Sequence, residues 1–158
     1  MNARARLALL IMVALTVLYG FAAARAGAGG KIGIQLTQVM ATEENAPGAK
    51  QFDATLSELK PQLENFRYRV YKNAGQEKKD VADGQEALFR LSEEGFTLHV
   101  TPGAAGDHVS LDLQIKDPKG KDILSTRIKI KDGGTGIVGK ELEKKTGRLF
   151  LAFTVKKS

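Results

Sequence analysis

The stretch FTLHVTPGAAGDHVSLDLQIKDPKGKDILSTRIKI, residues 96–130, holds three alternating segments separated by two turn sequences. One face of each segment is built from every second residue and is mainly apolar: Phe96, Leu98 and Val100, then Val109, Leu111, Leu113 and Ile115, then Leu124, Thr126, Ile128 and Ile130. A period of two is typical of a strand with one buried face. Because the turns at 102–107 and 117–120 are short, the stretch predicts a run of antiparallel strands.

The same alternation extends outward from this stretch in both directions. Further strands are predicted at 31–40, 66–71, 77–81, 86–91, 135–139 and 149–155, and turn signals such as Asp83-Gly84 and Asp132-Gly133-Gly134 separate several of them. Eight or nine short strands at this spacing, with no alternation of strands and helices, predict a mainly β fold. We expect an antiparallel β-sandwich or barrel-like domain.

One short helix is predicted near the start of the body. Asp53 is suited to cap it, and apolar residues follow at helical spacing. Pro61 interrupts the pattern because it cannot donate to the preceding turn. We therefore expect a helix over about 54–60, with a break or a second short turn beginning at Pro61. The charged segment 140–147 is expected to be a loop.

The N-terminal segment has the features of an export signal. Residues 1–6 are short and basic, residues 7–19 are apolar, and Ala24-Arg25-Ala26 is a small-residue cleavage signal before Gly27. We expect 1–26 to be a signal peptide, 27–30 a flexible tether and 31–158 a single β-rich domain, in the periplasm or secreted. The alternative is an uncleaved inner-membrane anchor with the body in the periplasm, since residues 7–24 are just long enough to span a bilayer.

Charge indicates which kinds of partner to expect, and cysteine content indicates whether the body has disulfides. The chain carries 24 basic and 18 acidic residues, for a net charge of +6. Three arginines would leave with the leader, which reduces the body to about +3, and its basic residues are interspersed with acids. We therefore expect no nucleic-acid partner, and membrane contact only through an uncleaved leader. With no cysteine, the body has no disulfide and is expected to be a monomer held by its core.

The two histidines are the first candidates for chemistry. Matching apolar faces across the 102–107 turn predicts the pairs Thr101–His108 and His99–Ser110, which would gather His99, His108, Ser110 and Asp112 on the outer face. Such a set could form an open metal site or a Ser-His-Asp arrangement. The alternative is an ordinary solvated sheet face, which we favour. We expect no catalytic residue, cofactor or metal, with His99, His108 and Asp112 as the candidates should a metal bind.

Two family resemblances follow from these features. The leader, the strand at 32–40, the helix at 53–63 and the β structure to the end are similar to those of small exported bacterial proteins of uncharacterised activity. Residues 98–139 resemble a β-hairpin region of bacterial secretins in Val100-Thr101-Pro102, the strand 109–115, Ser125-Thr126, and Asp132-Gly133 with Gly139. Lys140 stands where the secretin pattern has a second glycine.

These observations lead to one functional expectation with two alternatives. We expect an exported envelope binding or accessory module without catalytic activity, whose partner is an envelope protein. One alternative is a small secreted metal-binding protein or hydrolase that uses the His99 face. The other, which the secretin resemblance implies, is an anchored subunit of an envelope secretion or pilus assembly.

Overall fold

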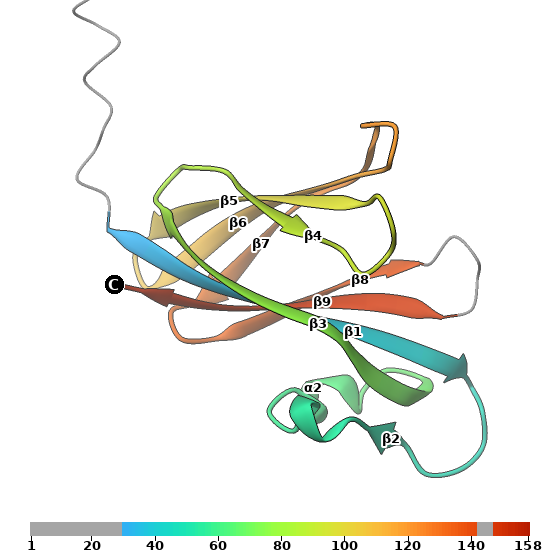
Figure 1. Ribbon diagram of the computed structural model, residues 1–158. Helices are drawn as coiled ribbons and strands as arrows, with labels where there is room; N and C mark the ends of the chain where they lie inside the picture. The colour runs from blue at the N-terminus through green and yellow to red at the C-terminus, as the bar shows by residue number, and fades with distance from the viewer. Residues whose placement is uncertain (1–29, 142–146) are drawn as a thin grey trace, which may run out of the picture.

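The computed structural model describes residues 30–141 and 147–158 and confirms the mainly β fold (Figure 1). Nine strands form two sheets that pack face to face and do not close into a barrel, so the sandwich expectation is confirmed. The leader lies outside the described residues. Within the described part, none of the helices has the length and apolar character needed to cross a membrane.

The larger sheet combines the two ends of the chain. Its strand order is β2-β3-β1-β9-β8, antiparallel throughout except for the parallel pair β2–β3. The bounds are β1 Lys31–Glu44, β2 Gln51–Phe52, β3 Tyr68–Ala82, β8 Thr135–Glu141 and β9 Arg148–Lys157. The two strands predicted at 66–71 and 77–81 are therefore one long strand, β3, which carries a bulge opposite Gln38 and Val39.

The smaller sheet is a continuous antiparallel meander from the middle of the chain. Its order β4-β5-β6-β7 is also the order of the sequence. The bounds are β4 Ala87–Arg90, β5 Thr97–Ala105, β6 His108–Lys116 and β7 Asp122–Lys131. The Asp83-Gly84 turn leads the chain into this sheet, with Gly84 at a φ of 77°, and the turn after Lys131 leads it back. The stretch that predicts the fold therefore forms most of one layer.

The main core lies between the two sheets. It is built from the inward side chains of alternating strands, all of them 1% exposed or less: Ile32, Ile34 and Leu36 of β1, Leu98 and Val100 of β5, Leu111, Leu113 and Ile115 of β6, and Leu151, Phe153 and Val155 of β9. Burial of this apolar area is the largest favourable contribution to the stability of the fold.

A second core covers part of the opposite face of the larger sheet. There η1 (Ala54–Leu56) and α2 (Lys60–Leu63) pack against the sheet through Leu56, Leu59 and Leu63. Asp53 caps η1 by accepting from the Thr55 N–H at 3.0 Å, as predicted. The helix predicted over 54–60 is wrong, because only the 3₁₀ turn η1 forms there. The second short turn predicted at Pro61 is present as α2, which begins at Lys60 with Pro61 in its first turn, where no N–H is needed.

The two ends of the described body lie side by side. The Ser158 N–H donates to the Lys31 carbonyl at 3.0 Å, and Figure 1 shows the C-terminus beside the start of β1. Any segment that precedes residue 30 therefore joins the sandwich at this end.

Candidate functional site

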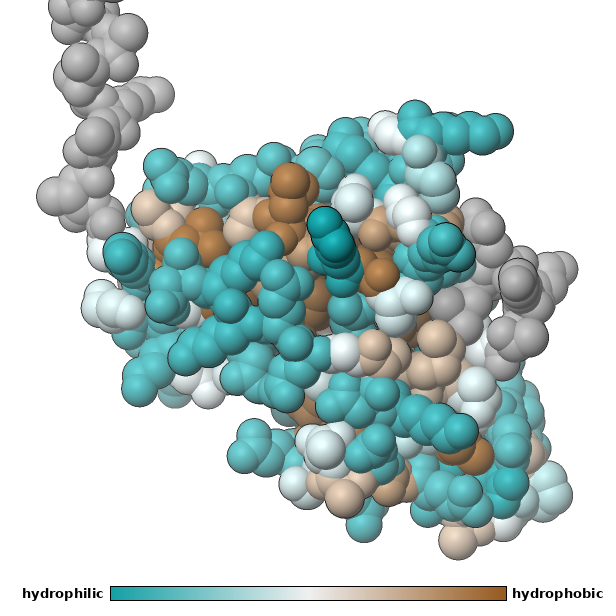
Figure 2. Space-filling model, viewed as in Figure 1, coloured by the Kyte–Doolittle hydropathy of each residue, from teal (hydrophilic) through white to brown (hydrophobic). Residues whose placement is uncertain are grey.

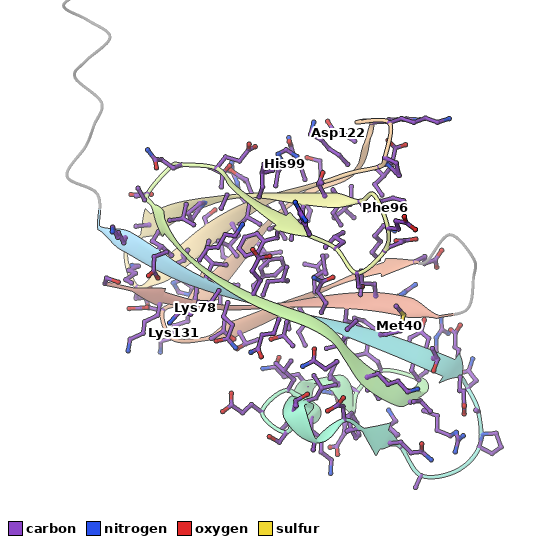
Figure 3. The ribbon with its side chains drawn as sticks, viewed as in Figure 1. Met40, Lys78, Phe96, His99, Asp122 and Lys131 are labelled. Atoms are coloured by element: carbon purple, nitrogen blue, oxygen red, sulfur yellow. The ribbon has the colours of Figure 1, made fainter. Side chains whose placement is uncertain are left out.

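The candidate site is the outer face of the smaller sheet, on the side away from the larger sheet. A groove of about 510 Å³ runs over β5, β6 and β7. We call this surface the outer face; the polar side chains that line its groove belong to Glu86, His99, Thr101, Asp112, Gln114, Ser125 and Arg127. Figure 3 shows His99 on this side of the upper sheet.

The register of the sheet explains why these side chains meet. His99, Gln114 and Ser125 lie opposite one another in one row across β5, β6 and β7. Thr101, Asp112 and Arg127 form the next row. Residues in register point to the same face, so the alternation that sends leucines inward brings all of these polar groups outward together.

Asp112 and Arg127 form the firmest pair on the outer face. Both guanidinium contacts are present: Arg127 Nε donates to Asp112 Oδ1, and Nη2 donates to Oδ2 at 2.9 Å. These hydrogen bonds lower the pKa of Asp112 and raise the pKa of Arg127. Because both side chains are exposed, solvent screens the pair, and its contribution to stability is small.

His99 pairs with an acid from the loop before β4. Its Nδ1 lies 3.2 Å from Glu86 Oε1, and the imidazole side chain is 18% exposed. Glu86 is exposed, so this contact ties the edge of the groove to the loop without burying a charge. His99 therefore lies on the outer face, as predicted, but its partner is a residue that the sequence pattern did not indicate.

The predicted register of the β5–β6 hairpin is wrong. The turn is the two-residue segment Gly106-Asp107, so Ala105 pairs with His108, Thr101 with Asp112, and His99 with Gln114. The four-residue shift keeps every side chain on its predicted face. Because His99 lies opposite Gln114 of β6, it is six residues along the sheet from His108, a separation of about 20 Å. His108 Nδ1 instead lies 2.6 Å from Asp107 Oδ1, and this hydrogen bond lowers the pKa of Asp107.

This arrangement separates the members of the candidate site. Asp112 is held by Arg127, and in the described part of the chain no hydrogen bond joins Ser110 to either imidazole. Across residues 30–141 and 147–158, no three His, Cys, Asp or Glu side chains are placed to hold a metal ion. In the described part of the chain, His99, His108, Ser110 and Asp112 therefore do not come together as a nucleophile–base pair or as one ligand set.

What the outer face does offer is free hydrogen-bonding capacity. Among the described residues, the side chains of Thr101, Gln114 and Ser125 have no intramolecular hydrogen bond, and they lie between the His99–Glu86 and Asp112–Arg127 pairs. Among the described residues, no Phe, Tyr or Trp side chain lines this groove, and its one aromatic ring is the largely buried His99 imidazole. The groove therefore has donors and acceptors of both charges, and it lacks the exposed Phe, Tyr or Trp ring on which a sugar or a base usually stacks.

Two buried polar groups lie at the end of the sandwich opposite the C-terminus, where Figure 3 shows Phe96 and Met40. Lys140 of β8, predicted to be in a charged loop, is 7% exposed; its Nζ pairs with Glu93 and lies 4.3 Å from the centre of the Phe96 ring. Gln38 of β1 donates to the Arg90 carbonyl at 2.8 Å and accepts from the Ser92 N–H at 2.7 Å. Both groups link the larger sheet to the β4–β5 connection, which makes them structural.

Comparisons with known proteins find no relative of this chain. A scan against protein-family models finds no match, and searches of curated proteins and of solved structures find none either.

Proposed function

We propose that this protein is a non-catalytic binding or accessory module of the bacterial envelope and that its partner docks on the outer face. The observation that carries the proposal is the groove over β5–β7, in which unpaired amide and hydroxyl groups lie between two ion pairs. Groups of this kind can hold a partner through hydrogen bonds and rim charges. They supply no acid, base or nucleophile in the geometry that catalysis needs.

Export is the second part of the proposal. Residues 1–26 have the composition of a signal peptide, and the body begins next to its own C-terminus at one end of the sandwich. The mass of the protein recovered from the periplasm tests this: we expect a chain that begins at Gly27. An intact Met1 in the membrane fraction would support the alternative of an anchored subunit.

Site-specific crosslinking tests the docking face. The chain has no cysteine, so one introduced thiol is a unique attachment point for a photo-crosslinker. Ser125→Cys places the label on the outer face, and Ser57→Cys, also exposed, places it on the helical layer. We expect a discrete adduct with an envelope protein from Ser125→Cys alone. Equal labelling from both positions, or none from either in exporting cells, would contradict the proposal.

A further inference from the structure

We propose that the free edge of β7 binds an extended, acidic segment of a partner protein, which adds a fifth strand to the smaller sheet. This inference rests on the proposed function, because it specifies the partner that would dock at the border of the outer face. The argument comes from the hydrogen-bonding edge, the charges along it and the apolar residues beneath it.

The edge of β7 away from β6 is unpaired over most of the ten residues of the strand; at its end the Lys131 carbonyl accepts from the Gly134 N–H at 2.7 Å. Among the described strands, β7 pairs with β6 only, and the chain passes from its end into β8 of the other sheet. Figure 3 shows its two ends, Asp122 and Lys131, at opposite ends of the molecule. An unpaired edge of this length is a template for another strand.

The ladder with β6 determines which backbone groups face outward. The Asp132 N–H donates to the Asp107 carbonyl at 2.9 Å, so this pair is a hydrogen-bonded one. Hydrogen-bonded and non-hydrogen-bonded pairs alternate in an antiparallel ladder. With the observed register, the residues whose N–H and C=O groups point away from β6 are Ser125, Arg127, Lys129 and Lys131.

The side chains of these same residues make the edge basic. They lie on the outer face, in register with Gln114, Asp112, Ser110 and His108. Arg127 is paired with Asp112, whereas Lys129 and Lys131 make no ion pair within the described residues. Two free cations two residues apart, about 7 Å, match acids at alternate positions of an added strand.

The inward side of β7 is incompletely covered. Leu124 and Ile128 are only partly buried against the main core. An added strand with apolar residues between its acids would cover them. The edge is thus complementary to a segment in which acidic and apolar residues alternate.

A second copy of this chain is disfavoured at the basic part of this edge. Two β7 strands paired about Arg127 would place the two Arg127 side chains opposite each other. Pairing about Ile128 would place Arg127 opposite Lys129 twice. Like charges directly opposite destabilise a strand pair, so the charges that disfavour self-pairing in these two registers also favour an acidic partner.

Peptide binding to the exported body tests the inference. The probes are a short capped peptide in which Glu alternates with Val and Thr, and its counterpart with Lys in place of Glu. At about 0.05 M salt we expect the acidic peptide to bind about tenfold more tightly than the basic one, with most of the difference lost at about 0.5 M. Replacing both Lys129 and Lys131 with Gln should weaken the acidic peptide by about tenfold.

A proline variant isolates the backbone contribution. Ser125→Pro removes an N–H that points to the free edge and changes no charge, and Ser125→Ala is its matched control. We expect the proline to weaken the acidic peptide about fivefold more than the alanine does, because the alanine removes only the hydroxyl and keeps the N–H. Should the proline variant not fold, protection of the β7 edge amides from hydrogen exchange by the acidic peptide is the substitute measurement.

The outcomes separate this inference from the proposed function. Equal binding of the two peptides, no binding of either, or no loss in the lysine variant would overturn the β7 inference. Those results together with an adduct from Ser125→Cys would leave the outer-face proposal standing. Absence of that adduct in exporting cells contradicts the proposed function whatever the peptides do.

Discussion

Replacing Lys140 with Met should destabilise the sandwich because it removes the charged half of a largely buried ion pair with Glu93. The Lys140 side chain is 8% exposed and that of Glu93 is 17% exposed, so the pair is largely removed from water. Breaking a buried pair by removing one partner costs about 3–5 kcal/mol. Because Glu93 keeps some access to solvent, we expect the lower end, about 3 kcal/mol, or a fall in Tm of about 10 °C for a body of this size.

Urea unfolding of three variants measures this effect. Lys140→Met is compared with Glu93→Gln and with the double variant, and the double-mutant cycle isolates the coupling between the two side chains. Lys121→Met, at an exposed position in the β6–β7 turn, is the matched control and should stay within about 0.5 kcal/mol of the parent. A loss below about 0.5 kcal/mol in Lys140→Met, or additive single effects, would refute the reasoning.

Three further predictions follow from the core, the exposed acids and the histidines. Phe153→Ala should cost about 3–5 kcal/mol in urea unfolding, because Phe153 is fully buried between the sheets; a loss below about 0.5 kcal/mol would contradict its placement. Hydrogen bonds from Thr55 and Arg127 lower the pKa values of Asp53 and Asp112 in the folded state, so their contributions are present above the unfolded pKa of about 3.9 and are lost as the pH falls through the lower folded values. The urea midpoint should therefore decrease below about pH 4, and a midpoint that rises there would contradict this sign. Calorimetry should find no stoichiometric, submicromolar zinc binding, because His99 and His108 are about 20 Å apart along the sheet; such binding, abolished by His99→Ala, would refute it.

The strand rhythm could be read from the sequence because its causes are local. Alternation at 109–115 and turns such as Asp83-Gly84 depend on neighbouring residues alone, and they predict the meander of the smaller sheet. The faces of β5 and β6 were predicted correctly for the same reason. The outer face was therefore identifiable as a polar surface that includes His99 and Asp112.

The register of the β5–β6 hairpin could not be predicted in this way, because it depends on residues outside the hairpin. Pro102 and Gly103 suggest a loop, yet both belong to β5, and Pro102 lies beyond the last β4 residue paired with that strand. A proline is tolerated where its missing N–H has no strand partner. Where β4 ends is not revealed by the alternation pattern. The resulting error in the predicted β5–β6 register placed His99 and His108 close together.

Burial on two faces was also missed, although the sequence contains a signal for it. Residues 149–153, LFLAF, are an unbroken apolar run, and such runs are typical of strands covered on both sides. Phe150 and Ala152 face the second core under η1 and α2. Lys140 had no comparable signal, because a lysine in a charged segment looks solvated until its partner Glu93 is placed 47 residues away.

Hydrogen–deuterium exchange with the crosslinked partner tests the central claim most directly. Amide exchange is compared between the free body and its complex with the envelope protein recovered through Ser125→Cys. The outer-face account predicts added protection confined to β5, β6 and β7, largest in β7. Protection confined to η1 and α2, or none in the smaller sheet, would contradict it.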